Sequence, residues 1–240
     1  NEGQAWLNDN ALRQKWGQWG FYRCWAKICE AVNKTRGEVL TFNGRLIKAY
    51  YHSTCGGVTE SALEMWGLNL PYLSSKKCHF DRQSPKYNER RQYSWRQWEK
   101  ESGLPKAKWF KAVPVTSTGA KYLHILAQTS TGRVKTMIIG GKKINGEVFR
   151  RRLGLNSSKL KISISSYGVS IVTTGYGHGI GLCQYGANGL AARGYKYAQI
   201  LKYYYSGVRI EKFNNFNKIK NESMKKFFSG KLALGGDIHD

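Results

Sequence analysis

Apolar positions along the chain change their spacing several times, and each spacing predicts a different element. The first regular run has apolar residues at helical intervals: Phe21, Trp25, Ile28 and Val32. It predicts an amphipathic helix that ends near Asn33. A shorter helix towards Trp16 is predicted before it, capped by Asp9 or Asn10 and separated from the second helix by glycines.

Runs rich in β-formers alternate with turn residues over much of the remaining chain. Asn43-Gly44 separates two such runs within residues 37–53, and both turn residues tolerate positive φ, so a hairpin is expected there. Further strands are expected at 122–128, 134–139, 159–165 and 169–174. Residues 61–114 lack these runs and are charged and Trp-rich, which indicates loop.

Short helices complete the pattern. They are expected at 146–155, after Ala187 up to Gly194, and at 197–205. Residues 212–240 are polar and basic and predict a loosely attached tail, which leaves one domain over residues 1–211. Hairpins with separated helices favour an α+β fold of twisted antiparallel sheets with peripheral helices.

The charge balance narrows the class of partner. The chain has 240 residues with 39 Lys+Arg against 15 Asp+Glu, a formal net charge of +24. Such an excess favours nucleic acid, an anionic membrane surface or an anionic cell-wall polymer as partner, and charge alone favours nucleic acid. Aromatic and basic residues together suit an acidic glycan or single-stranded nucleic acid equally well.

The cysteines and the N-terminal residues bear on the cellular compartment in which the protein works. Five cysteines occur, an odd number; Cys24 and Cys29 have the spacing of helix neighbours and suit buried positions. Cys55 and Cys78 are candidates for a disulfide in an oxidising compartment. No apolar run could cross a membrane, no secretory signal is present, and Asn1 comes first, so we expect a processed or engineered start.

The sequence YHSTCGGVTE (Tyr51 to Glu60) is the first candidate site, because it follows directly on a predicted strand. Its glycines predict a sharp turn with exposed amides, which suits a polar ligand, an oxyanion or a purely structural turn. Cys55 with His52 is a weakly signalled nucleophile pair. His52, Cys55, Cys78 and His79 are all residue types that zinc accepts, but adjacent Cys78 and His79 suit a tetrahedral site poorly.

The sequence GYGHGIGLCQYGA (Gly175 to Ala187) is the second candidate site. Alternate glycines allow close approach of a ligand or of another strand. No Gly-Lys-Ser/Thr follows, so a nucleotide-phosphate loop is excluded. His178 is either a cleft residue or a satisfied structural histidine, and Gln184 is either a helix cap or a ligand for a sugar hydroxyl.

The order of these motifs resembles the stage II sporulation protein D family. The resemblance covers roughly residues 4–210 and rests on five segments in order: 28–66 with HSTCGG, PYL (71–73), TGRVKTMIIGG (131–141), FRRRLGL (149–155) and 175–210 with GHGIGLCQYGA. HSTCGG and GHGIGLCQYGA are its most distinctive parts.

The resemblance implies a peptidoglycan lytic transglycosylase that acts at the septum or in sporulation. Such an enzyme cleaves peptide-free glycan strands between N-acetylmuramic acid and N-acetylglucosamine, with one glutamate as acid and then base and an anhydro-muramic product. Some relatives instead enhance an N-acetylmuramoyl-L-alanine amidase. The resemblance also implies an extracytoplasmic, wall-associated place with an N-terminal membrane anchor, and an amidase and a membrane protein as partners.

The sequence departs from the family pattern at the catalytic residue. The family's glutamate lies in a Glu-Met-Pro-like motif upstream of the position that matches Gln4, and no such motif occurs here. The zinc-binding His and Cys of some relatives also precede that position, so we expect no cofactor and no metal. Glu60 is the weak internal candidate for the acid, ahead of Glu64, and a structural or substrate-positioning role is the stronger expectation for it.

We therefore expect peptidoglycan glycan strands, and not nucleic acid, as the ligand of a groove lined by both motifs. The residues expected to border it are Tyr51, His52, Ser53, Thr54, Gly56, Gly57, Gly177, His178 and Gln184.

Overall fold

The computed structural model describes residues 7–103 and 123–212, and the predicted tail at 212–240 lies outside them apart from Lys212. The chain divides into two compact units, one of residues 1–41 and 210–240 and the other of residues 42–209. In the described ranges no helix combines the length and apolarity that a membrane crossing needs.

The smaller unit is built on the long helix α1 (Asp9–Lys34). Asn8 caps it by accepting a hydrogen bond from the Ala11 amide at 2.9 Å, one residue before the predicted cap. Gly17 has φ 68° and ψ 166°, a conformation open essentially to glycine alone, and it separates the two predicted helices by a kink. β1 (Glu38–Phe42) and β13 (Arg209–Lys212) form neighbouring strands of one sheet.

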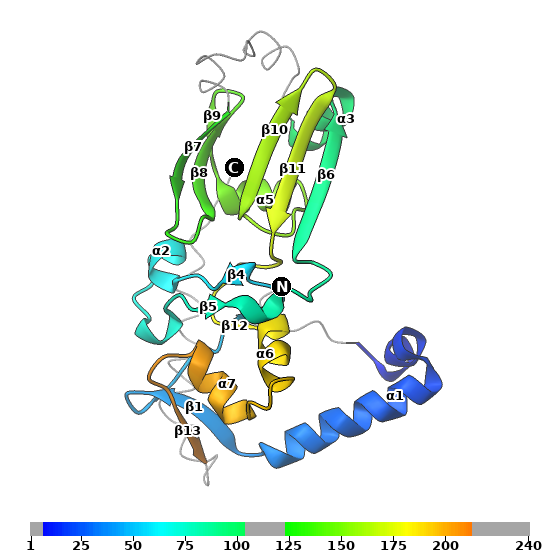
Figure 1. The fold of residues 1–240 in the computed structure, drawn as a ribbon, viewed down its shortest axis with the longest axis vertical. Helices are drawn as coiled ribbons and strands as arrows, with labels where there is room; N and C mark the ends of the chain where they lie inside the picture. The colour runs from blue at the N-terminus through cyan, green and yellow to red at the C-terminus, as the bar shows by residue number, and fades with distance from the viewer. Residues whose placement is uncertain (1–6, 104–122, 213–240) are drawn as a thin grey trace. The chain divides into compact units, whose positions relative to one another are not determined.

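The larger unit contains two three-stranded antiparallel sheets, which Figure 1 shows in its upper half. One sheet has the order β7-β8-β9, from Leu123–Gln128, Val134–Ile139 and Lys142–Asn145. The other has the order β10-β11-β6, from Leu160–Ser165, Gly168–Thr174 and Asn88–Ser94. The helices α3 (Trp95–Ser102) and α5 (Gly146–Arg152) pack into the same core as these sheets. This arrangement confirms the predicted α+β class.

Both sheets and both helices contribute to one hydrophobic core. Its buried members are Tyr93, Trp95, Trp98, Val134, Met137, Ile139, Phe149, Leu153, Leu155, Leu160, Val169 and Ile171. Tyr93 and Trp98 pack edge to face with ring centroids 5.9 Å apart, and the tilted ring of Phe149 lies 6.3 Å from that of Trp98. Burial of this cluster holds the sheets together and fixes the position of the loops that leave them.

The interpretation of residues 61–114 as loop was wrong for its described part. β6 pairs with β11 along its whole length, from Asn88↔Thr174 to Ser94↔Gly168, and α3 follows it directly. Most positions of β6 are charged or polar, and only Tyr93 is fully buried, so the strand lacks the apolar alternation on which strand prediction depends.

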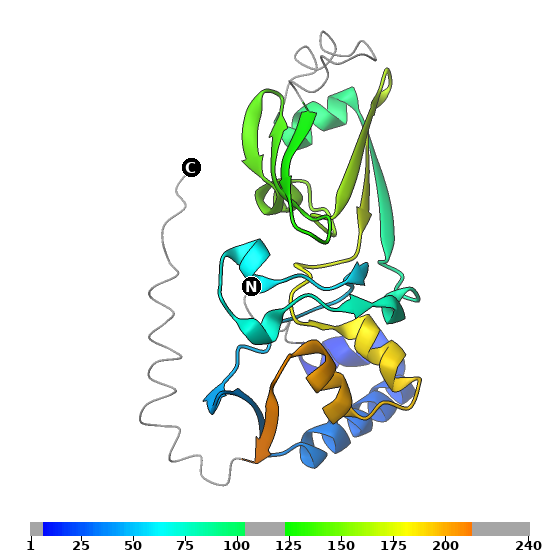
Figure 2. The same cartoon turned by 60° about the vertical axis from the view of Figure 1, so that its left-hand side comes forward.

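The remainder of the larger unit consists of short elements. The strands are β2 (Arg45–Leu46), β3 (Tyr51–His52), β4 (Gly57–Val58), β5 (Lys77–Cys78) and β12 (Leu182–Cys183). The helices are α2 (Ala62–Trp66), η1 (Pro71–Leu73), η2 (His79–Asp81), α6 (Gln184–Ala191) and α7 (Tyr197–Tyr204). Figure 2 shows α6 and α7, in yellow and orange, beside each other below the short strands. Asn43 and Gly44 both have positive φ, as the predicted hairpin turn requires.

Candidate functional site

The two distinctive motifs lie side by side and are joined by backbone hydrogen bonds. β3 and β12 pair in parallel, with Leu182 opposite Tyr51 and Cys183 opposite His52. Beyond these strands, Thr54 and Tyr176 exchange two backbone bonds of 3.0 and 2.7 Å, and the Glu60 amide donates to the Gly179 carbonyl at 2.8 Å. HSTCGG and GHGIGLCQYGA therefore form one continuous structural unit.

Glycines in both motifs make this close approach possible. A Cβ on Gly177 would lie 2.9 Å from the Cβ of His52, and one on Gly175 would lie 2.7 Å from the Thr54 carbonyl oxygen. Both glycines have positive φ, which side-chain-bearing residues rarely adopt. The alternate glycines thus serve the approach of another strand.

His52 and His178 lie close together in the middle of the joined motifs. Their ring centroids are 5.7 Å apart, and the ring of Trp66 lies 5.2 Å from that of His178. His178 Nδ1 accepts the Ile180 amide at 3.0 Å, and its ring also bonds to the Tyr51 backbone. Burial, assisted by the positive charge of Arg133, lowers the pKa of His178 to about 4, so this imidazole is neutral near pH 7.

His52 is more deeply enclosed than His178. Its Nδ1 lies 3.1 Å from the Ile180 carbonyl, to which it donates, while Nε2 is buried without a partner. Burial, with the neighbouring His178 and Arg133, lowers the pKa of His52 well below its usual value. Both histidines consequently act as neutral groups that connect the motifs.

The predicted binding residues divide into exposed and buried sets. Tyr51 and Gln184 are exposed, and Ser53, Gly57, Gly177 and His178 are partly exposed. His52, Thr54 and Gly56 are buried, and the Thr54 hydroxyl lies 2.6 Å from that of Ser84. The first set can contact a ligand directly, whereas the second set supports the surface from behind. Tyr176, which pairs with Thr54 and is exposed, was not among the predicted residues.

Glu60 is held in a buried ion pair. Its Oε1 lies 3.2 Å from Nε of Arg133, and both side chains are at most 1% exposed. Burial raises the pKa of Glu60, and the attraction of Arg133 offsets part of that rise. A carboxyl enclosed in this way has no access to a polymeric substrate, so the geometry favours the structural role expected for it. Glu64 lies in α2, and its carboxylate accepts hydrogen bonds from the backbone amide and the hydroxyl of Ser130.

Arg133 is the residue of the site that the sequence did not reveal. Its guanidinium donates to the Gly177 carbonyl at 2.9 Å and to Ser157 at 3.0 Å, and it reaches the Cys55 carbonyl at 3.5 Å. A Cβ on Gly179 would lie 2.5 Å from Nη2, so this glycine lies against the guanidinium. One arginine thus binds both motifs, whereas the sequence showed only that it lies in TGRVKTMIIGG, just before a predicted strand.

Cys55 and Cys78 are near each other but not bonded. All five cysteines, each within the described residues, are free thiols, so the disulfide predicted between Cys55 and Cys78 is not formed here. The sequence also offered His52 and His79 as zinc ligands beside these two cysteines. His79 is exposed and His52 bonds to the Ile180 carbonyl, so these two histidines do not join the cysteines.

The sequence has recognisable relatives, although no family model matches it. A stage II sporulation protein D from Bacillus amyloliquefaciens is 34% identical over 213 residues, which are 89% of this chain and 59% of that protein. Its namesake from Bacillus subtilis (strain 168) is 33% identical over the same shares. The chain belongs to the stage II sporulation protein D family.

Membership of the stage II sporulation protein D family confirms the resemblance seen in the sequence. An amidase enhancer of Bacillus subtilis is also similar, at 30% identity over 81% of this chain and 34% of the enhancer. The chain thus spans 59% of the length of the sporulation relatives it matches and a smaller part of the enhancer.

Proposed function

We propose that this protein takes part in cell-wall remodelling as a peptidoglycan lytic transglycosylase that acts on peptide-free glycan strands. The observation that carries the proposal is the direct pairing of β3 with β12, which joins the two distinctive family motifs into one surface. Its place of action would be extracytoplasmic, at the wall, with sporulation as the setting that its relatives' names suggest.

The exposed residues of the joined motifs supply suitable contacts for a sugar polymer. Tyr51 and Tyr176 offer aromatic faces to sugar rings, and they are 40% and 42% exposed. Ser53 and Gln184 offer hydrogen bonds to hydroxyl and acetamido groups. The net charge of +24 attracts the muramic carboxylates and other anionic wall polymers.

The proposed reaction needs one proton-transferring carboxyl group. The acid gives its proton to the bridging glycosidic oxygen as that bond breaks, and the C6 hydroxyl of the same muramic acid then bonds to C1. The proton of that hydroxyl returns to the carboxylate, so no water is consumed and an anhydro ring results. This differs from the paired carboxylates of ordinary glycosidases.

Glu60 does not suit that role, because it is buried and paired with Arg133. We assign the acid to the family's upstream Glu-Met-Pro-like motif, which in relatives precedes the position matching Gln4. The joined motifs would then supply the substrate-binding surface.

Mass spectrometry of peptide-free glycan strands tests the proposal. The strands are incubated with the chain alone and with a version extended by the upstream segment of a relative. Anhydro-muramic ends only with the extended version would support the assignment. Ends produced by the chain alone, and lost in Glu60→Gln, would transfer the acid to Glu60. Absence of such ends in both samples would reject the transglycosylase proposal.

A second candidate function is enhancement of an amidase without glycan cleavage. The similarity to an amidase enhancer favours it. An N-acetylmuramoyl-L-alanine amidase would then release stem peptides faster in the presence of the chain, and no anhydro ends would form. An amidase and a membrane protein are the proposed partners in either case.

A further inference from the structure

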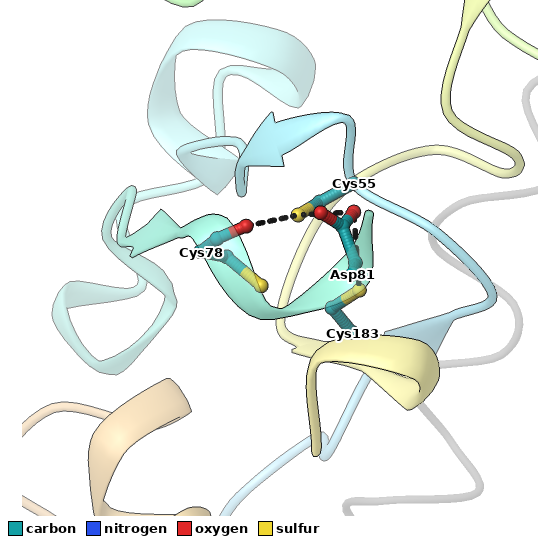
Figure 3. A group of neighbouring side chains, drawn as sticks. All are labelled: Cys55, Cys78, Asp81 and Cys183. Atoms are coloured by element: carbon teal, nitrogen blue, oxygen red, sulfur yellow. Dashed lines mark hydrogen bonds between the residues drawn. The ribbon is translucent and has the colours of Figure 1, made fainter. Parts of the chain in front are cut away.

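Three cysteines and one aspartate meet in the interior of the larger unit. Cys55 follows β3, Cys78 ends β5, Asp81 ends η2, and Cys183 ends β12 as the N-cap of α6. All four residues are buried, and their three sulfur atoms and one carboxylate oxygen lie within 4.8 Å of one another. Figure 3 shows the four side chains pointing towards one another, with Cys78 and Asp81 on one segment and Cys55 and Cys183 on two others.

The Asp81 carboxylate is the least expected member of this group. Oδ2 accepts the Gly56 amide at 2.8 Å and the Cys55 thiol at 3.1 Å, and the Cys183 sulfur lies 3.8 Å away. Oδ1 has no hydrogen-bond partner although Asp81 is 0% exposed. A buried carboxylate with an unpaired oxygen is costly in free energy unless a cation compensates it.

We propose that Cys55, Cys78, Asp81 and Cys183 bind one divalent metal ion of the zinc class. A tetrahedral zinc ion with Zn–S bonds of about 2.3 Å holds its sulfur ligands roughly 3.8 Å apart. The four candidate ligand atoms lie within 4.8 Å of one another, and the Asp81 oxygen lies 3.1 and 3.8 Å from the sulfur atoms of Cys55 and Cys183, so the cluster is compact enough to surround a single ion. Four protein ligands in a buried place leave no open coordination position, which is typical of a structural site.

Metal binding would change the protonation of the cluster. Cysteine binds zinc as the thiolate, so each of the three thiols would give its proton to solvent as its bond to the ion forms. The loaded site would then have three thiolates and one carboxylate as ligands.

Neighbouring groups complement the negative charge of a loaded site. The Gly186 amide donates to the Cys183 sulfur at 3.3 Å, and the Tyr204 hydroxyl lies 3.1 Å from the Cys78 sulfur. The Lys159 ammonium donates to the Gly56 carbonyl at 3.1 Å, one residue from Cys55. Such outer contacts orient ligands and stabilise their anionic form. A Cβ on Gly186 would overlap the Cys78 sulfur, so this glycine leaves the space that the sulfur occupies.

This ligand set differs from the histidine-containing set that was considered for zinc from the sequence. The proposal also differs from the sequence-based expectation that the protein binds no metal. Cys183 comes from the second motif, and Asp81 replaces His79 as the residue of η2 that points inward. The ion would tie together HSTCGG, η2 and the start of α6. The site is independent of the proposed reaction, because metal binding can be measured without any substrate.

Metal content of the complete chain is the direct test. The protein is purified under reducing conditions, loaded with zinc, freed of excess metal, and analysed by elemental mass spectrometry. We expect one zinc per chain, lost in Cys183→Ser and retained in the control Cys29→Ser, which removes an exposed thiol outside the cluster. Absence of zinc in the reduced protein, or unchanged zinc in Cys183→Ser, would overturn the proposal. A Cys55–Cys78 disulfide that persists under these reducing conditions would also overturn it.

A second pair of variants keeps the test informative if Cys183→Ser does not fold. Asp81→Asn preserves the shape of the side chain and its bond to Gly56, and it should weaken zinc binding by roughly 10–100-fold in competition with a chromophoric chelator. Asp81→Cys should bind at least as tightly as the wild type, and in the cobalt-loaded protein its sulfur-to-cobalt absorption should rise by about a third, since four thiolates replace three. Equal cobalt spectra for Asp81→Cys and the wild type would exclude Asp81 as a ligand position.

Discussion

Gly181 must be a glycine because a neighbouring backbone atom leaves no room for a side chain, and not only because of its backbone conformation. Its φ is 74°, and a Cβ there would overlap the Tyr50 carbonyl oxygen, which also accepts the Leu182 amide and the Tyr205 hydroxyl. Gly67 has a similar φ of 70° but nothing within 4 Å. Comparing the two separates backbone strain from collision.

We predict that Gly181→Ala lowers the free energy of unfolding by at least about 3 kcal/mol, whereas Gly67→Ala costs about 1 kcal/mol. The difference reflects displacement of β3 from β12, which the smaller strain at Gly67 does not cause. Urea denaturation of both variants measures it. Equal losses would mean that the Tyr50 carbonyl can move away without cost.

His178 should make stability depend on pH in the acid range. Its pKa of about 4 in the folded protein lies below the usual 6.5, because burial and Arg133 disfavour the imidazolium, and the ring of His52 faces it. The unfolded chain therefore takes up a proton that the folded protein refuses. The corresponding stability is complete above about pH 6.5 and is lost as pH falls towards 4, by up to about 3 kcal/mol.

The variant His178→Asn tests this dependence, because its amide oxygen can still accept the Ile180 amide. Its unfolding free energy should fall less steeply between pH 6.5 and 4 than that of the wild type. His124→Asn, at an exposed position of β7, should keep the wild-type slope. A wild-type slope in His178→Asn as well would assign the acid sensitivity to other groups.

Between elements, one ion pair holds much of the site together. Arg133, just before β8, pairs with Glu60, just after β4, and reaches the backbone of both motifs. Removing one partner leaves the other as an unpaired buried charge, so Arg133→Met should cost about 3–5 kcal/mol. The double variant Glu60→Gln/Arg133→Met should lose much less than the two single variants added together.

Denaturation of the two single variants and the double variant measures the coupling energy directly. The control is Lys34→Gln, which breaks the Glu30–Lys34 pair on α1, where the two side chains are 61% and 72% exposed. Its effect on the free energy of unfolding should be much smaller than that of Arg133→Met, because a solvent-exposed ion pair contributes little. Additive losses for Glu60 and Arg133 would indicate that the pair contributes through packing alone.

The elements differ in how far the sequence reveals them. The hairpin of β10 and β11 was predicted because its apolar residues alternate around Tyr167-Gly168. Local helix signals predicted α7 and the second half of α6, which begins at Gln184 and therefore earlier than expected. β6 was missed, since its strand character comes from pairing with β11 and not from its own polar residues. Local patterns therefore reveal elements that carry their own apolar face.

The site shows the same division. The motifs were visible as glycine- and cysteine-rich segments, and their order indicated the family. The contacts of Arg133 with Gly177 and of Asp81 with Cys55 were invisible, because each joins single polar residues far apart in the chain. Only the folded chain brings such residues together, so buried polar partners are the part of a site that one sequence reveals least.

At the scale of the whole molecule, the positive charge should govern attachment to the wall. A net charge of +24 attracts anionic polymers over distances set by the ionic strength, and the screening length falls from about 8 Å at physiological salt to about 3 Å at 1 M. We predict that binding to purified cell-wall sacculi weakens by about 10-fold or more over that range. Sacculi stripped of their anionic polymers should show a smaller dependence on salt.

The binding that persists at high salt should come from sugar contacts at the joined motifs. Tyr51→Ala removes an exposed aromatic face from β3 and should reduce this salt-resistant part, while the loss on going from low to high salt stays the same. Tyr167→Ala is the matched control, because Tyr167 is 88% exposed at the turn between β10 and β11. Sedimentation of each variant with sacculi at both salt concentrations gives the two contributions. If Tyr167→Ala reduced the salt-resistant binding as much as Tyr51→Ala, the aromatic contacts would be unspecific. The proposal that the glycan binds at β3 and β12 would then be wrong.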